Sequence, residues 1–222
     1  MIQSALQELW DELPDGTKLV AISKYHPSSA IEEAYACGQR IFGENHVQEL
    51  VQKESALPKD IEWHFTGHLQ TNKVKYIAPF ISLIHSADSI KLLREIDKQG
   101  RRVGRRIRCL LELHIAAEET KYGLSPSDVR DLYSGDLLSE LENVEVCGLM
   151  CMGTNTDDTN RIHTDFATAK SLFDEIRGKY YSDGSSFNEL SMGMSDDYKI
   201  ALEHGSTMVR IGTRIFGERE YC

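Results

Sequence analysis

Short apolar runs alternate with longer amphipathic segments along the whole chain, and this alternation restricts the fold more than any other feature of the sequence. Eight runs have the length and apolar content of buried strands. They lie at 19–23, 40–43, 61–67, 81–86, 107–115, 144–150, 188–192 and 208–212. Because a helical pattern separates each run from the next, the sequence predicts βαβ units and a parallel sheet.

The helical patterns complete these units and add one helix before the first strand. They cover 28–37, 46–55, 72–77, 88–99, 125–141, 159–177 and 195–203, with an initial helix at 2–13. Asp88 and Ser125 are start signals, and Gly100 is a stop signal. Eight units in 222 residues fit a closed (β/α)8 barrel of the TIM type better than an open doubly wound sheet. Without repeats or linker-like segments, residues 1–222 are expected to form one α/β domain.

Composition excludes several classes of partner. The formal net charge of −10 argues against nucleic acid or an anionic membrane surface, since both require a basic footprint. The longest uncharged stretch, 76–87, is shorter than the ~20 apolar residues of a membrane helix. No signal region precedes the first strand, so we expect a cytoplasmic monomer with its five cysteines reduced. Cys147 and Cys151 are expected to be core thiols, not zinc ligands.

Lys24 is the first candidate for chemistry. Functional residues in a barrel gather where the strands end, and Lys24 directly follows the clearly apolar run 19–23. An ammonium held at that point loses hydration, which favours the neutral amine that can attack an aldehyde carbon. Most lysines are solvated surface charges, but this position favours a functional role.

The end of the last strand offers a seat for a phosphate. Gly212 and Thr213 lie where the strand exits, just before a short segment that can turn into a helix, and barrels often bind phosphate after strands 7 and 8. Ser191 and Ser195 add hydroxyl groups from the end of the preceding strand. Ser195 could equally be the N-cap of the helix at 195–203, and both interpretations stay open. The loop 205–207 is expected at the opposite rim.

Two further side chains could reach a ring seated between Lys24 and Gly212. Arg210 precedes Gly212 by two residues, so both face the same side of the strand. Its alternative role is to pair with a carboxylate inside the barrel. Asn45 ends the second strand beside the first, where it could hydrogen-bond a ring hydroxyl or simply cap a loop.

The remaining histidines and arginines indicate no second site. His64 and His68 lie on a strand without a third ligand, so no metal site is expected, and His64, His85 and His114 are expected to be core or supporting residues. Five arginines lack interleaved aromatic residues and are expected in a solvated loop that leads into the fifth strand. They are Arg101, Arg102, Arg105, Arg106 and Arg108.

Longer motifs resemble the pyridoxal phosphate homeostasis protein family, whose fold is a barrel of the alanine racemase N-terminal type. They are AISK at 21–24, FGENHVQE at 42–49, WHFTGHLQTNK at 63–73, the segment 190–196 and GSTMVRIGTRIFG at 205–217. The motifs occur in the family's order and span about residues 18–217.

The resemblance implies that Lys24 holds pyridoxal 5'-phosphate (PLP) as a Schiff base, with Arg210 near the pyridine nitrogen and Asn45 close to the ring. It also implies a phosphate site made of Ser191, Ser195, Gly212 and Thr213. Members are regarded as carriers or regulators in vitamin B6 and amino-acid homeostasis, without established turnover.

The chain departs from the family pattern at three positions. His46 replaces a usual Tyr, Tyr25 replaces a common Thr, and His114 replaces a usual Asn. These departures affect the tuning of the pocket and leave the lysine, arginine and phosphate residues in place.

An arginine opposite the pyridine nitrogen disfavours its protonation and makes the ring a weaker electron sink. A racemase also needs a second acid/base group on the opposite face, which the alanine racemase fold supplies from an extra domain that 222 residues do not accommodate. We therefore expect a non-catalytic carrier that passes PLP to amino acids or apo-enzymes. The alternatives are an amino-acid racemase with Tyr25 or His85 as the opposing base, and a PLP-free class I aldolase that uses Lys24.

Overall fold

Eight parallel strands close into a barrel in chain order, β1 to β8. The computed structural model describes residues 1–118, 122–181 and 186–218. The strands are β1 Lys18–Ile22, β2 Ile41–Glu44, β3 Glu62–Phe65, β4 Leu83–Ala87, β5 Ile107–Leu113, β6 Val144–Cys151, β7 Glu189–Ser191 and β8 Met208–Ile211. The barrel closes where β8 pairs with β1, with Val20 opposite Arg210. The predicted (β/α)8 barrel and all eight strands are confirmed, with ends that move by at most two residues.

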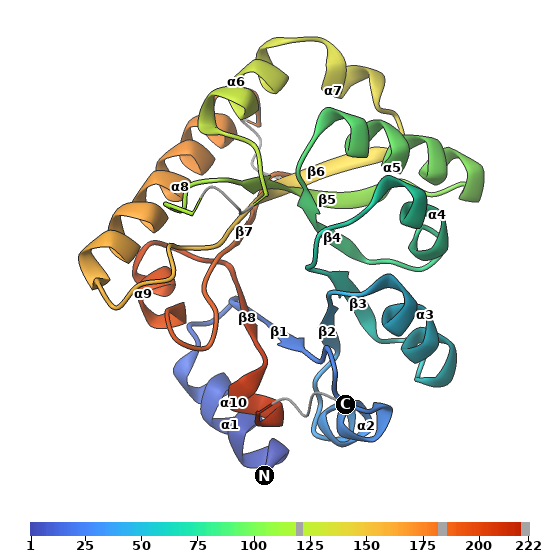
Figure 1. Ribbon diagram of the computed structural model, residues 1–222, viewed down its shortest axis with the longest axis vertical. Helices are drawn as coiled ribbons and strands as arrows, with labels where there is room; N and C mark the ends of the chain where they lie inside the picture. Colours follow the sequence, from blue (N-terminus) through green and yellow to red (C-terminus); the bar gives the residue numbers. More distant parts are fainter. Residues whose placement is uncertain (119–121, 182–185, 219–222) are drawn as a thin grey trace.

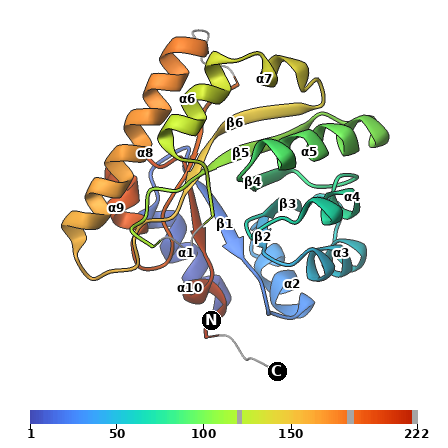
Figure 2. The same cartoon turned by 45° about the horizontal axis from the view of Figure 1, so that its top comes forward.

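Helices surround the strands, as Figures 1 and 2 show. They are α1 Ile2–Glu12, α2 Ser28–Ala36, α3 Val47–Ala56, α4 Val74–Ile77, α5 Ile90–Val103, α6 Pro126–Ser134, α7 Leu137–Glu140, α8 Thr159–Tyr180, α9 Tyr198–Glu203 and α10 Thr213–Phe216, with a 3-10 turn η1 at Thr71–Lys73. The predicted initial helix is α1, and α10 packs beside it. The short helix expected after the last strand is therefore present.

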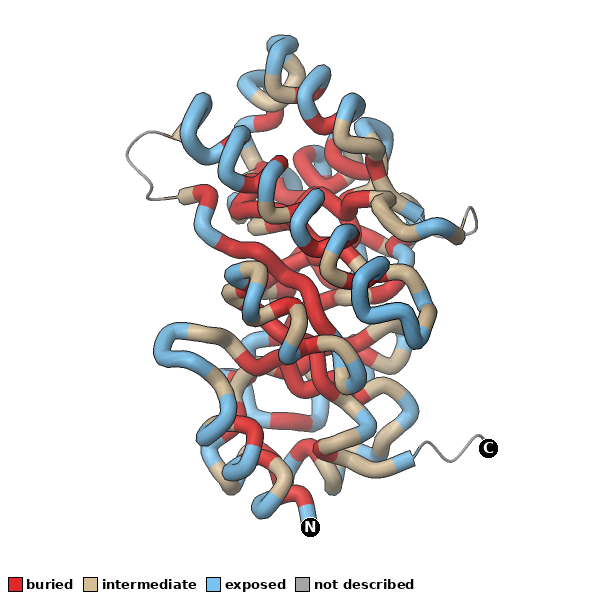
Figure 3. The backbone as a smooth tube through the Cα atoms, turned by 90° about the vertical axis from the view of Figure 1, so that its left-hand side faces the viewer, coloured by how far each residue is buried: buried red, intermediate tan, exposed pale blue. Residues whose placement is uncertain are grey.

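The sheet separates two apolar clusters, which explains why its strands are apolar on both faces. Leu19 and Ala21 belong to the large cluster between strands and helices, whereas Val20 and Ile22 belong to a small cluster inside the barrel. Successive side chains of a strand point to opposite faces, so this alternation fixes the orientation of β1. Buried residues run through the strands and exposed ones lie on the outer faces of the helices (Figure 3).

Charged side chains close the amino-terminal end of the barrel. Glu189 of β7 is buried and pairs with Lys18 of β1, while Arg108 of β5 lies 3.6 Å from the same carboxylate oxygen. Arg108 Nε also donates to Cys147 Sγ at 3.2 Å. In this way the buried carboxylate is held by two cations, and the opposite, carboxyl end of the barrel is left for ligands.

The predicted end of the helix at 88–99 was wrong. Helix α5 begins after Ser89, whose Oγ accepts the Leu92 N–H, and continues through Gly100 to Val103, where Gly104 adopts a left-handed conformation. Glycine suits position 100 for a different reason than helix termination: a Cβ there would lie 2.7 Å from the Arg105 carbonyl oxygen and 2.9 Å from the Asn143 carbonyl oxygen, so this face of the helix packs closely.

The arginines at 101–108 do not form the expected solvated loop either. Arg101 and Arg102 occupy the last turn of α5, where cations complement the helix dipole. Arg105 donates to the carbonyls of Ala78 and Ile81 at 2.7 and 2.9 Å. Arg106 and Arg108 bond to β6, through the Val144 carbonyl and the Cys147 thiol.

Two other predicted helices needed correction. The pattern at 125–141 forms α6 and α7, which are separated at Gly135. The helix predicted from Ser195 begins at Tyr198, after Asp197, whose Oδ1 accepts the Met194 N–H at 2.6 Å. Ser195 is therefore not the N-cap, and its hydroxyl is available to a different role.

The cysteines that the structure describes are free thiols, buried at 109, 147 and 151 and half-buried at Cys37. The expected core thiols Cys147 and Cys151 are thus confirmed, whereas Cys222 lies outside the described residues. Within the described part of the chain, no helix is long and apolar enough to cross a membrane.

Gly148 of β6 tests how closely β6 and β7 pack. An added Cβ would lie 1.7 Å from the Glu189 carbonyl oxygen, and φ is +154°. We expect Gly148→Ala to lower the free energy of unfolding by about 3 kcal/mol or more. Gly178→Ala on the exposed face of α8 meets no atom within 4 Å, and should raise it by about 0.5–1 kcal/mol. Urea denaturation measures both, and equal effects would contradict the packing argument.

Candidate functional site

A cavity opens at the carboxyl end of the strands. Its lining comes from β1, β8 and the segments that follow β1, β2, β3, β6, β7 and β8. It comprises Ile22, Lys24, Asn45, Thr66, Met152, Met194, Ser195, Arg210, Gly212 and Thr213. The structure thus brings together six of the seven predicted site residues. Ser191, the seventh, is fully buried and is not among the lining residues.

Lys24 reaches the cavity because of the register of β1. Val20 and Ile22 face the barrel interior, so two residues later Lys24 continues on the same side, past the strand end. The next residue, Tyr25, has a φ of +67°, which is rare for a bulky side chain. The chain therefore turns sharply out of the barrel immediately after Lys24.

Arg210 lies at the floor of the cavity and is fixed by two hydrogen bonds. It donates from Nη1 to Ser191 Oγ at 2.7 Å and from Nη2 to the Cys151 carbonyl at 2.9 Å. Burial lowers the pKa of the guanidinium, and the nearby Asp197 and Glu112 carboxylates oppose this shift. Among the described ion pairs none joins Arg210 to a carboxylate, so its predicted alternative, a direct pair inside the barrel, is not formed.

Ser191 links Arg210 to two buried histidines. His85 Nδ1 lies 3.0 Å from Ser191 Oγ, and His85 Nε2 lies 3.0 Å from His64 Nδ1. Burial lowers the pKa of His64 to about 3 and that of His85 well below its ordinary value. Both rings are therefore neutral, and Arg210 is the one charged member of this four-residue chain. His64 and His85 are core residues, as expected, and neither lines the cavity.

The charge of the cavity is opposite to that of the chain. Lys24 and Arg210 are the charged side chains among its described lining residues, and no carboxylate is among them. In a protein of net charge −10, two cations facing one cavity favour an anionic ligand. The hydroxyls of Ser195 and Thr213 add donors without adding charge.

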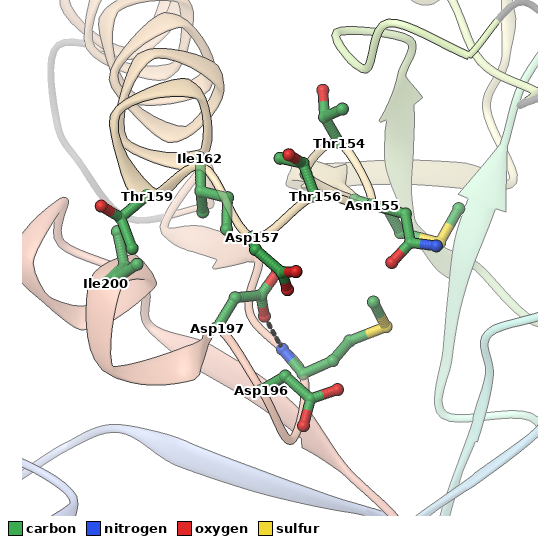
Figure 4. Close-up of a pocket in the computed structure, with 12 residues that line it drawn as sticks. Thr154, Asn155, Thr156, Asp157, Thr159, Ile162, Asp196, Asp197 and Ile200 are labelled. Carbon is green, nitrogen blue, oxygen red and sulfur yellow. Dashed lines mark hydrogen bonds between the residues drawn. The ribbon is translucent and has the colours of Figure 1, made fainter.

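A second cavity of about 420 Å³ adjoins the first, and both are lined by Met152 and Met194. Figure 4 shows its carboxylates Asp157, Asp196 and Asp197, with Asp197 bonded to the Met194 N–H. The boundary between the acidic and cationic cavities therefore lies at two flexible apolar side chains.

The end that could hold a phosphate is built around Gly212, which precedes the first turn of α10. A Cβ at this position would lie 3.0 Å from the Ile22 carbonyl oxygen, so a larger residue would push β8 and β1 apart. The first N–H groups of any helix have no partner within it, and a phosphate oxygen is a suitable acceptor.

Asn45 is oriented by the neighbouring strand. Thr66 Oγ1 donates to Asn45 Oδ1 at 2.9 Å, which leaves the Asn45 side-chain amide nitrogen as a donor. Gly67 permits this approach, because a Cβ there would lie 2.4 Å from the Asn45 carbonyl oxygen. Sequence reasoning missed Thr66, although it directly follows β3 and so lies at a strand end as Lys24 does.

Two departures from the family pattern contact each other. Tyr25 Oη lies 2.8 Å from His46 Nε2, and the two rings are 5.2 Å apart. The unusual residues at 25 and 46 therefore form one exposed pair at the cavity mouth. His114, the third departure, lies apart from this pair, with Nε2 3.0 Å from the Glu118 carbonyl oxygen.

The barrel and its cationic mouth define a protein of the alanine racemase N-terminal type. The family model "Alanine racemase, N-terminal domain" matches residues 2–220, and the chain belongs to this family. More particularly, it belongs with the pyridoxal phosphate homeostasis proteins. It is 42% identical to that of Aquifex aeolicus over 205 residues, covering 92% of this chain and 88% of the relative. The human protein is 39% identical over 214 residues, covering 92% and 77%.

Solved structures agree with this assignment. PipY of Synechococcus elongatus without PLP has a TM-score of 0.91 at 36% identity, covering 98% of this chain and 100% of that one. PipY with PLP bound has a TM-score of 0.87 over the same shares of the two chains. Alanine racemase from Streptomyces coelicolor shares the fold alone, with a TM-score of 0.78 at 18% identity, and 57% of its chain is covered.

Glu112 of β5 is a buried carboxyl near Arg210 whose titration should affect stability. Burial raises its pKa to about 7, Asp88 raises it further, and Arg210 opposes both. The folded protein therefore binds more protons than the unfolded chain between about pH 4.5 and 7, so this group lowers stability as pH rises through that range.

Replacing Glu112 by Gln removes this titration. We expect Glu112→Gln to match the wild type near pH 5 and to exceed its free energy of unfolding at pH 8 by up to about 3 kcal/mol. The neutral histidines are common to both proteins, so their opposite pH dependence cancels in the difference. Denaturant unfolding at several pH values measures the effect, and a difference that does not change with pH would contradict a raised pKa.

Proposed function

We propose that this protein binds PLP, holds it on Lys24 as a Schiff base, and serves in PLP and amino-acid homeostasis. The observation that carries the proposal is a cavity whose charged lining residues are Lys24 and Arg210, with hydroxyl donors beside them. Relatives named for pyridoxal phosphate homeostasis, and the PLP-bound PipY structure, support the choice of ligand.

The residues of the cavity fit the parts of this cofactor. A primary amine at Lys24 suits the aldehyde, and the first turn of α10 with Ser195, Gly212 and Thr213 suits the phosphate. Asn45 would donate to the ring hydroxyl, and Arg210 would face the ring nitrogen. Ser191 supports the site through Arg210, which differs from the direct phosphate contact that the resemblance implies.

Lys24 acts by binding covalently. In its neutral form the Lys24 amine would bond to the aldehyde carbon as C=N, with both amine protons and the carbonyl oxygen leaving as water. An incoming primary amine would reverse the attachment: its nitrogen would take over the C=N bond, and its two protons would pass to Lys24. Amino acids and apo-enzymes that carry such an amine are the acceptors we propose for a monomeric carrier.

Bound PLP supplies an electron-withdrawing ring, and Arg210 limits that chemistry. Its guanidinium donates hydrogen bonds and accepts none, so it cannot stabilise a protonated ring nitrogen as a carboxylate would. The hydrogen bonds to Ser191 and to the Cys151 carbonyl hold the positively charged guanidinium of Arg210 in place at the floor of the cavity. This arrangement favours holding the cofactor over carbanion chemistry.

The two candidates for the opposing base of a racemase are poorly placed for that role. His85 is fully buried beneath the cavity, between Ser191 and His64. Tyr25 is about half exposed, and its hydroxyl lies 2.8 Å from His46 Nε2 at the mouth. Neither residue lines the cavity, which supports a carrier in preference to the racemase alternative.

The site at Lys24 is tested by spectroscopy and labelling. Wild-type protein incubated with PLP should show a visible absorption band, and borohydride should fix the label on Lys24. We expect Lys24→Ala to lose both signals and to keep its thermal unfolding temperature. Exposed Lys59→Ala is the matched control and should retain them. A normal band and label in Lys24→Ala would refute the site, and a borohydride label formed without PLP by an added ketose would favour the aldolase.

Carrier and racemase differ in α-proton exchange. The PLP-loaded protein is incubated with single L-amino acids in deuterium oxide and followed by NMR and chiral chromatography. We expect exchange no faster than with free PLP at the same concentration, because no second acid/base group lines the described cavity. Racemisation at about 1 s⁻¹ or faster would instead identify an enzyme.

A further inference from the structure

Lys53 of α3 is a buried lysine that the proposed chemistry does not use. Its side chain is 7% exposed, and Nζ lies outside the barrel wall, behind the ends of β1 and β2. Nζ donates to the Ser23 carbonyl at 2.8 Å, to Glu44 Oε1 at 2.7 Å and to Glu49 Oε1 at 2.7 Å. All three protons of the ammonium are thereby used.

Hydrogen bonds of this network hold the backbone both before and after Lys24. The Ser23 carbonyl that binds Lys53 belongs to the peptide unit before Lys24. The N–H of the peptide unit after it, that of Tyr25, donates to Glu49 Oε1 at 2.7 Å. Lys53 and Glu49 are themselves paired, so one ion pair holds the two peptide units that flank the Lys24 Cα atom.

The residue after Lys24 has a backbone conformation that is rare for a bulky side chain. Tyr25 has a φ of +67°, which is costly for a bulky side chain unless other contacts support it. The bond from Tyr25 N–H to the Glu49 carboxylate is such a contact, since it is charge-assisted. The turn that directs Lys24 into the cavity is therefore maintained from outside the barrel.

The network is costly to bury. Glu44 is fully buried, its Oε1 accepts from Ser23 Oγ at 2.6 Å as well as from Lys53, and its Oε2 has no hydrogen-bond partner among the described residues. Burial raises the pKa of Glu44 to about 7, against the opposing effect of Lys53. Well-packed apolar residues often stabilise a fold as much as a buried ion pair does. The network is therefore better explained by its effect on the position of the backbone around Lys24 than by its effect on stability.

We propose that Lys53, Glu44 and Glu49 form a clamp that fixes the backbone on both sides of Lys24 and so positions its amine for the cofactor's aldehyde. The three residues are positioning residues, because none of them lines the cavity. A clamp of this kind stabilises the covalent attachment, since a prearranged amine recombines with the aldehyde faster than a mobile one. The inference rests on the proposed Schiff base.

A comparison of two ligands distinguishes two roles for the clamp: positioning the Lys24 amine, or supporting the whole site. PLP has the aldehyde that Lys24 attacks, whereas pyridoxamine 5'-phosphate carries an amine there and can use only the ring and phosphate contacts. A defect confined to the position of the Lys24 amine therefore changes the release of PLP and leaves the release of pyridoxamine 5'-phosphate unchanged.

Glu49→Gln is the main variant, because Glu49 is about one-fifth exposed and tolerates loss of its charge better than a buried group. Lys53→Met is the stronger variant, and its folding is checked by thermal unfolding. Glu54 and the exposed Lys59 form a pair of the same chemistry at the end of α3, with an N–O distance of 2.8 Å, and Glu54 is about as exposed as Glu49. Glu54→Gln and Lys59→Met are therefore the matched controls.

Release of each ligand from the preloaded protein is measured by dilution into excess apo-acceptor or by stopped-flow displacement. We expect Glu49→Gln to release PLP about tenfold faster than the wild type, and pyridoxamine 5'-phosphate within about twofold of it. Lys53→Met should change PLP release more strongly, and both controls should match the wild type. Equal acceleration of both ligands, or no change in either, would overturn the clamp.

The same measurements identify a failure of the underlying proposal. In the wild type, PLP should leave more slowly than pyridoxamine 5'-phosphate, and Lys24→Ala should abolish the difference. If the wild type releases both ligands at one rate, the Schiff base itself is absent and the clamp is overturned with it. If the difference depends on Lys24 and not on Glu49 or Lys53, only the clamp is wrong.

Discussion

The pairing of β8 with β1 is the constraint on which the site depends. Val20 lies opposite Arg210 and Ala21 opposite Ile211, so the residues that leave these strands, Lys24 and Gly212, emerge at adjacent points of one rim. Nearly two hundred residues separate them along the chain. Because parallel strands end at the same edge, closure of the barrel places an amine beside a possible phosphate seat without any contact between distant loops.

Charge is sorted along the barrel axis in a way that suits this site. Glu189 pairs with Lys18 and lies near Arg108 at the amino-terminal end, and above it lie apolar side chains, two neutral histidines and the buried carboxyl of Glu112. At the carboxyl end, Arg210 and Lys24 are the cations among the described residues that line the cavity. In a low-dielectric interior, their attraction for an anion is screened far less than it would be on the acidic outer surface.

Strand positions could be read from the sequence because the strands of a parallel barrel are apolar on both faces and stand out as continuous runs. Helix ends were less predictable. Gly100 is a residue type typical of a helix end, but α5 continues through it and glycine there permits close packing. Ser195 is a residue type typical of an N-cap, but α9 begins after Asp197. Residue type alone therefore does not fix a helix end, because the same residue can serve close packing or a turn instead.

Ser191 and Lys53 show where residue-level reasoning ends. Ser191 ends β7 and so was expected at the ligand, yet it lies beneath Arg210 and bonds to His85. Glu49 and Lys53 have the i,i+4 spacing of an ordinary surface pair, yet Lys53 is buried against Ser23 and Glu44. Spacing along a helix predicts which residues of that helix are neighbours, but it does not predict which residues of other elements bury them.

By itself, the sequence determined the alternation of strands and helices, the barrel, and the position of Lys24 at a strand end, because these follow from local apolar periodicity. The tertiary structure alone decided which side chains surround Lys24, how Arg210 is held, and how the turn at Tyr25 is supported. These features depend on contacts between elements that closure of the barrel brings together, and no local pattern records them.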